Sequence, residues 1–170
     1  IVVVPESGEI VPNVENIIYV MTTYPDGTPA ETEITIHDKA SEEARKALQT
    51  DSLGVATCKI IPRSNHLSLL VKAVDEKGNR AEREQDFQTE KGNHLLLRTD
   101  EALYKVGDIV HAEVFSGKQT GSVYIDLIKA KQTILTKSVM MEKGRGTVDI
   151  HLSAGDFGTL EMHALSLIHI

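Results

Sequence analysis

The chain has 170 residues, of which 41% are hydrophobic and 25% charged, and its formal net charge is −7. This composition is ordinary for a packed soluble protein. Aromatic residues make up only 4% and tryptophan is absent, so the core must be built from Val, Ile and Leu, which favour strands. The acidic balance and the absence of a basic run exclude the usual nucleic-acid binder and argue against contact with an anionic membrane surface.

The sequence also lacks the features of a protein that is inserted in a membrane through a helix or held together by disulfide bonds. No stretch approaches the roughly 20 apolar residues of a membrane-spanning helix, and no signal peptide opens the chain. Because Ile1 stands where an initiator Met would be, we expect an excised or processed piece of a longer protein. Cys58 is the single cysteine and no Asn-X-Ser/Thr sequon occurs, which favours a bacterial or archaeal source over a glycosylated animal serum protein.

The first half of the chain alternates short apolar runs with turn signals. The turn Pro25-Asp26-Gly27 separates the first two predicted strands, and further turns are expected at residues 51–54 and 76–79. This spacing is typical of a β-sandwich and not of alternating strands and helices. The strands predicted here are residues 16–22, 31–37, 54–61, 67–74 and 80–88.

The segment Ser41–Thr50 is ambiguous. Ala40, Ala44, Ala47 and Leu48 fall at helical spacing, and Ser41 with the acidic residues after it could begin a helix. The segment nevertheless runs directly into the turn at residues 51–54, which leads to another strand. We expect extended or loop structure here and keep a short helix as the alternative.

The second half carries the clearest period of two. In each predicted strand, one set of alternate residues is apolar and the other is polar, as expected when one face packs on a core and the other meets water. Strands are predicted at 94–99, 108–116, 122–129, 133–140, 146–152 and from residue 158 onward. The inward sets are Val110, Ala112 and Val114; Val123, Ile125 and Leu127; Val148, Ile150 and Leu152; and Leu160, Met162 and Ala164.

A polar segment near Gln88–Asn93 predicts a domain boundary. It contains one Gly and is too short for a flexible tether. The sequence therefore predicts an all-β protein of two tandem immunoglobulin-like or fibronectin-III-like antiparallel β-sandwich domains, residues 1–90 and 91–170.

The histidines raise the question of a metal site. His111 and His151 both point away from the apolar faces, and Glu113 and Asp149 would stand near them if their strands are neighbours. No His-x-His or HExxH spacing supports zinc binding, so we interpret these residues as solvent-exposed groups on an outer sheet face.

Two further candidates have simpler structural explanations. Cys58 shares a predicted face with Ala56 and Ile60, which indicates a buried, inert thiol and not a nucleophile. The segment Asp75–Asn79 resembles a calcium loop only loosely and fits a tight hairpin turn. The sequence therefore predicts no catalytic, cofactor-binding or metal-binding residue, and a protein that is not an enzyme.

One stretch resembles a known family. Leu97, Thr99 and Asp100, followed by Tyr104 and then Gly107-Asp108, are similar to the entry strand of macroglobulin domains. Glu101 stands where that pattern has a lysine. The resemblance continues through residues 121–137 and 158–164, and upstream through residues 24–30 and 50–56, so it covers nearly the whole chain. The residues fit their positions, because Gly107 suits a positive φ and Tyr104 has a large apolar body with a polar tip.

This resemblance to the α2-macroglobulin family of bacterial or archaeal type implies a function. Members trap proteases that cut an exposed bait segment, and many carry a thioester in a Cys-Gly-Glu-Gln motif that is absent here. The resemblance implies a scaffold pair, the fourth and fifth macroglobulin domains, from an extracellular or periplasmic parent. Its partners would be neighbouring macroglobulin domains, with target proteases reached only through the full-length protein. The alternative is a pair of immunoglobulin-like modules from a bacterial adhesin or surface-anchored enzyme.

The second predicted domain ends on an apolar, strand-like segment. It offers six strands, whereas a sandwich of the macroglobulin type has seven, and Leu167–Ile170 remain apolar. We therefore expect the native protein to continue into a final strand. We also expect an unpaired edge along the last strand here, with a risk of dimerisation or strand swapping through it.

Overall fold

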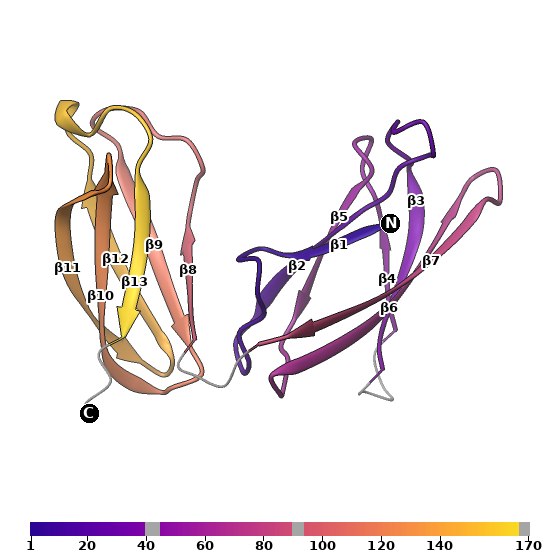
Figure 1. Cartoon of the computed structure of the whole chain (residues 1–170), viewed down its shortest axis with the longest axis horizontal. Coiled ribbons are helices and arrows are strands. Elements are labelled where there is room, and N and C mark those ends of the chain that lie inside the picture. The colour runs from indigo at the N-terminus through magenta and orange to yellow at the C-terminus, as the bar shows by residue number, and fades with distance from the viewer. Residues whose placement is uncertain (40–44, 90–93, 167–170) are drawn as a thin grey trace. The chain divides into compact units, whose positions relative to one another are not determined.

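The computed structural model describes residues 1–39, 45–89 and 94–166, in which antiparallel strands are joined by turns and loops (Figure 1). Among the described residues, the regular structure that is not a strand is a short 3-10 turn at Ala154–Asp156. The all-β antiparallel fold class predicted from the alternating pattern is confirmed. The chain divides into two compact units, Ile1–Lys91 and Gly92–Ile170, each with its own core. No helix in the described part of the chain has the length and apolarity needed to cross a membrane.

The first unit is a sandwich of a three-stranded and a four-stranded sheet. The smaller sheet has the order β1-β2-β5 and the larger has the order β4-β3-β6-β7. All its ladders are antiparallel. The strands are β1 (Val2–Pro5), β2 (Asn16–Met21), β3 (Thr32–Asp38), β4 (Arg45–Gln49), β5 (Val55–Ile60), β6 (His66–Asp75) and β7 (Arg80–Gln88).

Alternate residues of the central strands form the core of this unit. In β6, every second side chain from Leu67 to Ala73 is buried while the intervening ones are at least partly exposed. The same alternation in β3 buries Ile34 and Ile36 against them. β7 differs, because most of its side chains are exposed and Phe87 is the one that packs on the core. A charged, exposed edge strand of this kind protects a sheet against unwanted pairing.

The second unit folds a single six-stranded ladder into two layers. Its order is β13-β10-β11-β12-β9-β8, but β11 and β12 pair only at Glu142 and Arg145, so the sheet turns a corner between them. β13 and β8 approach each other at the opposite side without a described ladder between them. The strands are β8 (Leu95–Thr99), β9 (Ile109–Ser116), β10 (Thr120–Lys129), β11 (Gln132–Glu142), β12 (Arg145–His151) and β13 (Glu161–Ser166).

The inward sets predicted for the second unit are the residues that build its core. Val114 and Ile125 are fully buried, and Ile150 is buried beside them. Val148, Leu152, Leu160 and Met162 are only partly buried, because they lie toward the margins of the sandwich. The inward faces were therefore predicted correctly. The alternating pattern did not predict how deeply each side chain is buried.

Three elements differ from the predictions by more than a shift of one or two residues at a strand end. The helical alternative for Ser41–Thr50 is wrong over Arg45–Gln49, which form β4; there, pairing with β3 and packing of Leu48 on the core outweigh helical spacing. Residues 40–44 lie outside the described residues. The last strand begins at Glu161 and not at residue 158, because the 3-10 turn and a loop precede it. β1 was not predicted, since four residues are too few to show a period.

Candidate functional site

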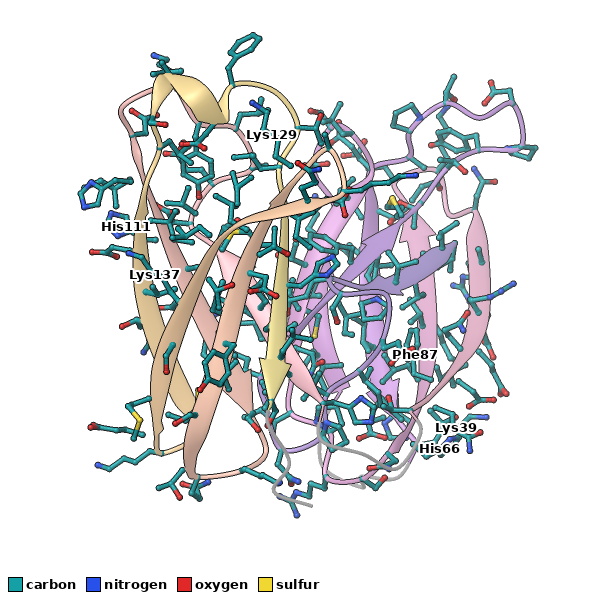
Figure 2. The ribbon with its side chains drawn as sticks, turned by 60° about the vertical axis from the view of Figure 1, so that its left-hand side comes forward. Lys39, His66, Phe87, His111, Lys129 and Lys137 are labelled. Carbon is teal, nitrogen blue, oxygen red and sulfur yellow. The ribbon has the colours of Figure 1, made fainter. Side chains whose placement is uncertain are left out.

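The outer face of β9 and β12 brings together a histidine and a carboxylate. His111 and Asp149 are directly opposite each other in the β9–β12 ladder, and His111 Nδ1 lies 2.7 Å from Asp149 Oδ1. This hydrogen bond raises the pKa of His111 above 6.5, and the negative charges of Asp149 and Asp100 add to the effect. Figure 2 shows His111 projecting from the surface of this unit. Both side chains are more than half exposed, so the pair lies in water and not in a cleft.

The neighbouring pair on the same face is an ion pair. Arg145 donates to Glu113, and its guanidinium also lies 5.8 Å from the centre of the Phe115 ring. The Arg98 guanidinium lies 4.9 Å from the same ring. Two cations on one aromatic ring, with a carboxylate beside them, make a cross-strand polar surface of the kind that stabilises a sheet.

This geometry does not build the zinc site considered from the sequence. Glu113 is engaged by Arg145 and not by His111, and His151 is opposite Ile109 in the ladder. The condition for such a site is met, because β9 and β12 are neighbours, but His111 pairs with Asp149 and Glu113 pairs with Arg145. In the described ranges, no group of three or more His, Cys, Asp or Glu side chains could hold a metal ion.

Cys58 lies inside the first unit. Its side chain is buried in β5 as part of the core, with Ala56 on the same face. Burial raises the pKa of the Cys58 thiol, which keeps it in the unreactive protonated form. The prediction of a buried thiol is therefore confirmed.

The segment Asp75–Asn79 is a hairpin turn between β6 and β7. Asp75 Oδ1 accepts hydrogen bonds from the backbone amides of Lys77 and Asn79, and Oδ2 accepts from Asn79 Nδ2 and the Tyr24 hydroxyl. These donors, with Asn79 Nδ2 contributing most, lower the pKa of Asp75. Its oxygens are occupied in closing the turn, so the turn interpretation is confirmed.

The first unit contains a buried network of threonines that no pattern in the sequence indicated. Thr22 Oγ1 donates to the Ala30 carbonyl and lies 3.1 Å from Thr32 Oγ1. Thr50 Oγ1 accepts from the Thr32 amide and donates to Ala30. Isolated threonines in separate strands carry no pattern, and only the sandwich brings them together. The network satisfies buried polar groups and leaves no nucleophile with a base.

The motif that carries the family resemblance builds one specific loop. Asp100 Oδ1 accepts hydrogen bonds from the Tyr104 hydroxyl and from the His111 amide. The Tyr104 hydrogen bond is the main cause of a lowered Asp100 pKa. Gly107 has φ +95°, as its position predicted, and Asp108 Oδ2 accepts from the Lys105 amide. The loop between β8 and β9 is thus held by residues of the motif itself.

A cleft of about 780 Å³ lies at the end of the second unit, beside that loop. One wall comes from residues 99–106 and the other from residues 152–160, and between them the cleft reaches core residues such as Leu127 and Met162. Its rim has two highly exposed apolar side chains, Leu103 at 87% and Phe157 at 79%. Sequence reasoning missed this cleft, because two loops far apart in the chain form it. We refer to it below as the end cleft.

Comparison with known proteins adds no assignment. No family model matches this sequence, and no curated protein matches it.

Proposed function

We propose that the chain is a structural scaffold of an α2-macroglobulin-like protease-trapping inhibitor from the extracellular space or the periplasm. In this role the two sandwich units are consecutive macroglobulin-type modules that hold neighbouring modules of the parent in place. The chain itself supplies no bait segment and no thioester motif.

The observation that carries this proposal is the role of the motif residues in the loop between β8 and β9. Asp100, Tyr104 and Asp108 are joined to the loop backbone by hydrogen bonds, and Gly107 supplies the positive φ there. The residues of the pattern that resembles macroglobulin domains therefore act together to hold one loop. If the pattern matched by chance, its residues would not need to share a structural role.

A second support is the repetition of one module. The ladders of β1-β2-β5 and β3 with β4 and β6 recur as β8-β9-β12 and β10 with β11 and β13. Repeated sandwiches of one connectivity are typical of proteins in which modules act as spacers and supports. Modules of an adhesin or a surface-anchored enzyme share this property, so the repetition alone does not separate the two readings.

The test is a protection assay on the full-length protein that contains this chain. A trap encloses a protease, so the bound protease should lose activity on a large protein substrate and retain activity on a short peptide substrate. The 170-residue chain alone should leave both activities unchanged, because a pair of modules cannot enclose a protease. A full-length protein that fails to protect the large substrate, or that carries a cell-wall anchor or catalytic domain in place of a trap, contradicts the proposal.

A further inference from the structure

Each unit has a seam where the edge strands of its two layers lie close together without a full ladder. In the first unit β4 ends one sheet and β5 ends the other, and no ladder joins them in the described residues. In the second unit β11 and β12 occupy the equivalent places and pair only at Glu142 and Arg145. Elsewhere in the described part of the chain, each of these four strands is paired along one side only. We call the two regions the β4–β5 seam and the β11–β12 seam.

A lysine crosses each seam to a backbone carbonyl on the far side. Lys46 of β4 donates a hydrogen bond from Nζ to the Lys59 carbonyl of β5. Lys137 of β11 donates from Nζ to the Asp149 carbonyl of β12 at 2.6 Å. Figure 2 shows Lys137 on the same side of the second unit as His111, which pairs with Asp149. In both units the hydrogen bond joins one layer of the sandwich to the other.

The two lysines occupy equivalent positions of their ladders. Lys46 lies opposite Ile36 of β3, and Lys137 lies opposite Ile125 of β10. Both isoleucines are buried in the core of their unit. Residues directly opposite each other in a ladder lie on the same face of the sheet. Each lysine therefore occupies an inward position of an edge strand.

An inward lysine interrupts the apolar set of each edge strand. Its neighbours in that set, Leu48 in β4 and Leu135 and Val139 in β11, pack on the core. A lysine stem covers apolar surface of this kind while its ammonium group remains at the open side. Burial raises the pKa of the Cys58 thiol, and the nearby charge of Lys46 opposes that rise. The charge of Lys46 thus lies close to the core margin, at the seam.

Open edge strands are prone to pair with strands of another chain, and an inward-pointing charge is one device that blocks such pairing. A strand that added to β12 at the β11–β12 seam would have to displace Lys137 from the Asp149 carbonyl. It would also cover the ammonium group and remove it from water. Burial of an unpaired charge is strongly unfavourable, so the lysine opposes strand addition there.

We propose that Lys46 and Lys137 guard the two seams and prevent the edge strands from pairing with a second copy of this chain. Each lysine occupies a carbonyl of the opposite edge strand, and its charge makes covering of the seam unfavourable. The same residue type recurs at the same ladder position in both units. A lysine without a role would not need to recur there. The proposal does not depend on the protease-trap role.

The test replaces Lys137 by Met, which keeps an unbranched stem and removes both the charge and the donor. Sedimentation velocity over a concentration series should show at least tenfold tighter self-association of Lys137→Met than of the unsubstituted chain. The substitution takes the formal net charge from −7 to −8, so weaker electrostatic repulsion cannot explain the gain. Lys137→Arg keeps the charge and the donors, so it should associate no more than the unsubstituted chain.

Hydrogen exchange locates the association. Amides of β11 and β12 in Lys137→Met should exchange more slowly as the protein concentration rises, because new backbone hydrogen bonds form there. Association through any other edge is common to all variants and cancels in the comparison with the unsubstituted chain. In the first unit, Lys46→Met should increase association in the same way, with the new protection in β4 and β5.

Matched controls separate the loss of the lysine from a general rise in strand propensity. Ser138→Val adds a β-branched residue at an exposed position of β11 and leaves Lys137 in place. Ala47→Val does the same in β4 beside Lys46. Both control variants should associate no more than the unsubstituted chain.

Circular dichroism first establishes that each variant is folded, and if Lys137→Met does not fold, Lys46→Met decides by the same criteria. The proposal is wrong if the Met variants associate no more than the unsubstituted chain. It is also wrong if the Arg or Val variants associate as strongly as the Met variants, or if the new protection lies outside the seams. A loss of unfolding free energy without association would identify the lysines as clamps between the layers and not as guards.

Discussion

The Thr89 hydroxyl donates a hydrogen bond to the Ile10 carbonyl across 79 residues of sequence. Thr89 also donates its backbone amide to the Asn65 carbonyl, so the residue after β7 fastens two separate loops at one end of the sandwich. Both Thr89 and Ile10 are buried. Because the Ile10 carbonyl belongs to a buried residue, water cannot readily replace the Thr89 donor if it is lost.

We therefore expect Thr89→Val to destabilise the first unit. Valine keeps the shape and removes the donor, so the buried Ile10 carbonyl loses this partner, at a cost of about 1–3 kcal/mol in the free energy of unfolding. Urea unfolding followed by circular dichroism measures the change. Thr57→Val is the matched control, because Thr57 is exposed on β5 of the same unit and its loss should change stability by less than about 0.5 kcal/mol. Equal midpoints for the two variants would show that the hydrogen bond contributes nothing.

A second prediction separates backbone conformation from crowding at two glycines. Gly54 has φ +73° and Gly27 has φ +86°, so an alanine at either position is strained by about 1–2 kcal/mol. A Cβ on Gly54 would also overlap the Thr22 carbonyl oxygen, whereas a Cβ on Gly27 would meet nothing within 4 Å. Thermal unfolding should show a loss for Gly54→Ala well beyond that for Gly27→Ala. Similar losses would mean that the backbone around Gly54 relaxes easily.

The third prediction concerns pH. Because Asp149 raises the folded-state pKa of His111, the pair stabilises the protein fully below the unfolded value of about 6.5, provided that Asp149 is ionised. This contribution is lost as pH rises through the raised pKa. An NMR titration of the His111 ring should show the raised pKa, and Asp149→Asn should lower it. Glu113→Gln is the control and should leave it nearly unchanged, because Glu113 is paired with Arg145. A His111 pKa that does not respond to Asp149→Asn contradicts the assignment.

The fourth prediction concerns the reactivity of Cys58. The side chain is 2% exposed and its pKa is raised by burial, so thiol reagents should label the native protein slowly and the urea-unfolded protein rapidly. Cys58→Ala should cost about 1–2 kcal/mol, at the low end for core truncations. The rate of labelling gives the check, and rapid modification under native conditions would refute the buried assignment.

Local alternation in the sequence was enough to determine the fold class and most of the core. Val110, Ala112 and Val114 had to share a face, because successive side chains of a strand point to opposite sides. The buried position of Cys58 followed from the same period, and the positive φ of Gly107 followed from its place in a turn. Each of these properties depends on residues only a few positions apart.

Tertiary structure decided everything that depends on which strands are neighbours. Whether residues 45–49 form a helix or a strand was decided by pairing with β3, since spacing within the segment allowed both. His111 meets Asp149 and Glu113 meets Arg145 only because of the register of β9 and β12, which no local pattern specifies. The end cleft likewise exists because loops about fifty residues apart close over one end of a sandwich. A period of two shows on which face of the strand a side chain lies. It carries no information about which strand is the hydrogen-bonded neighbour.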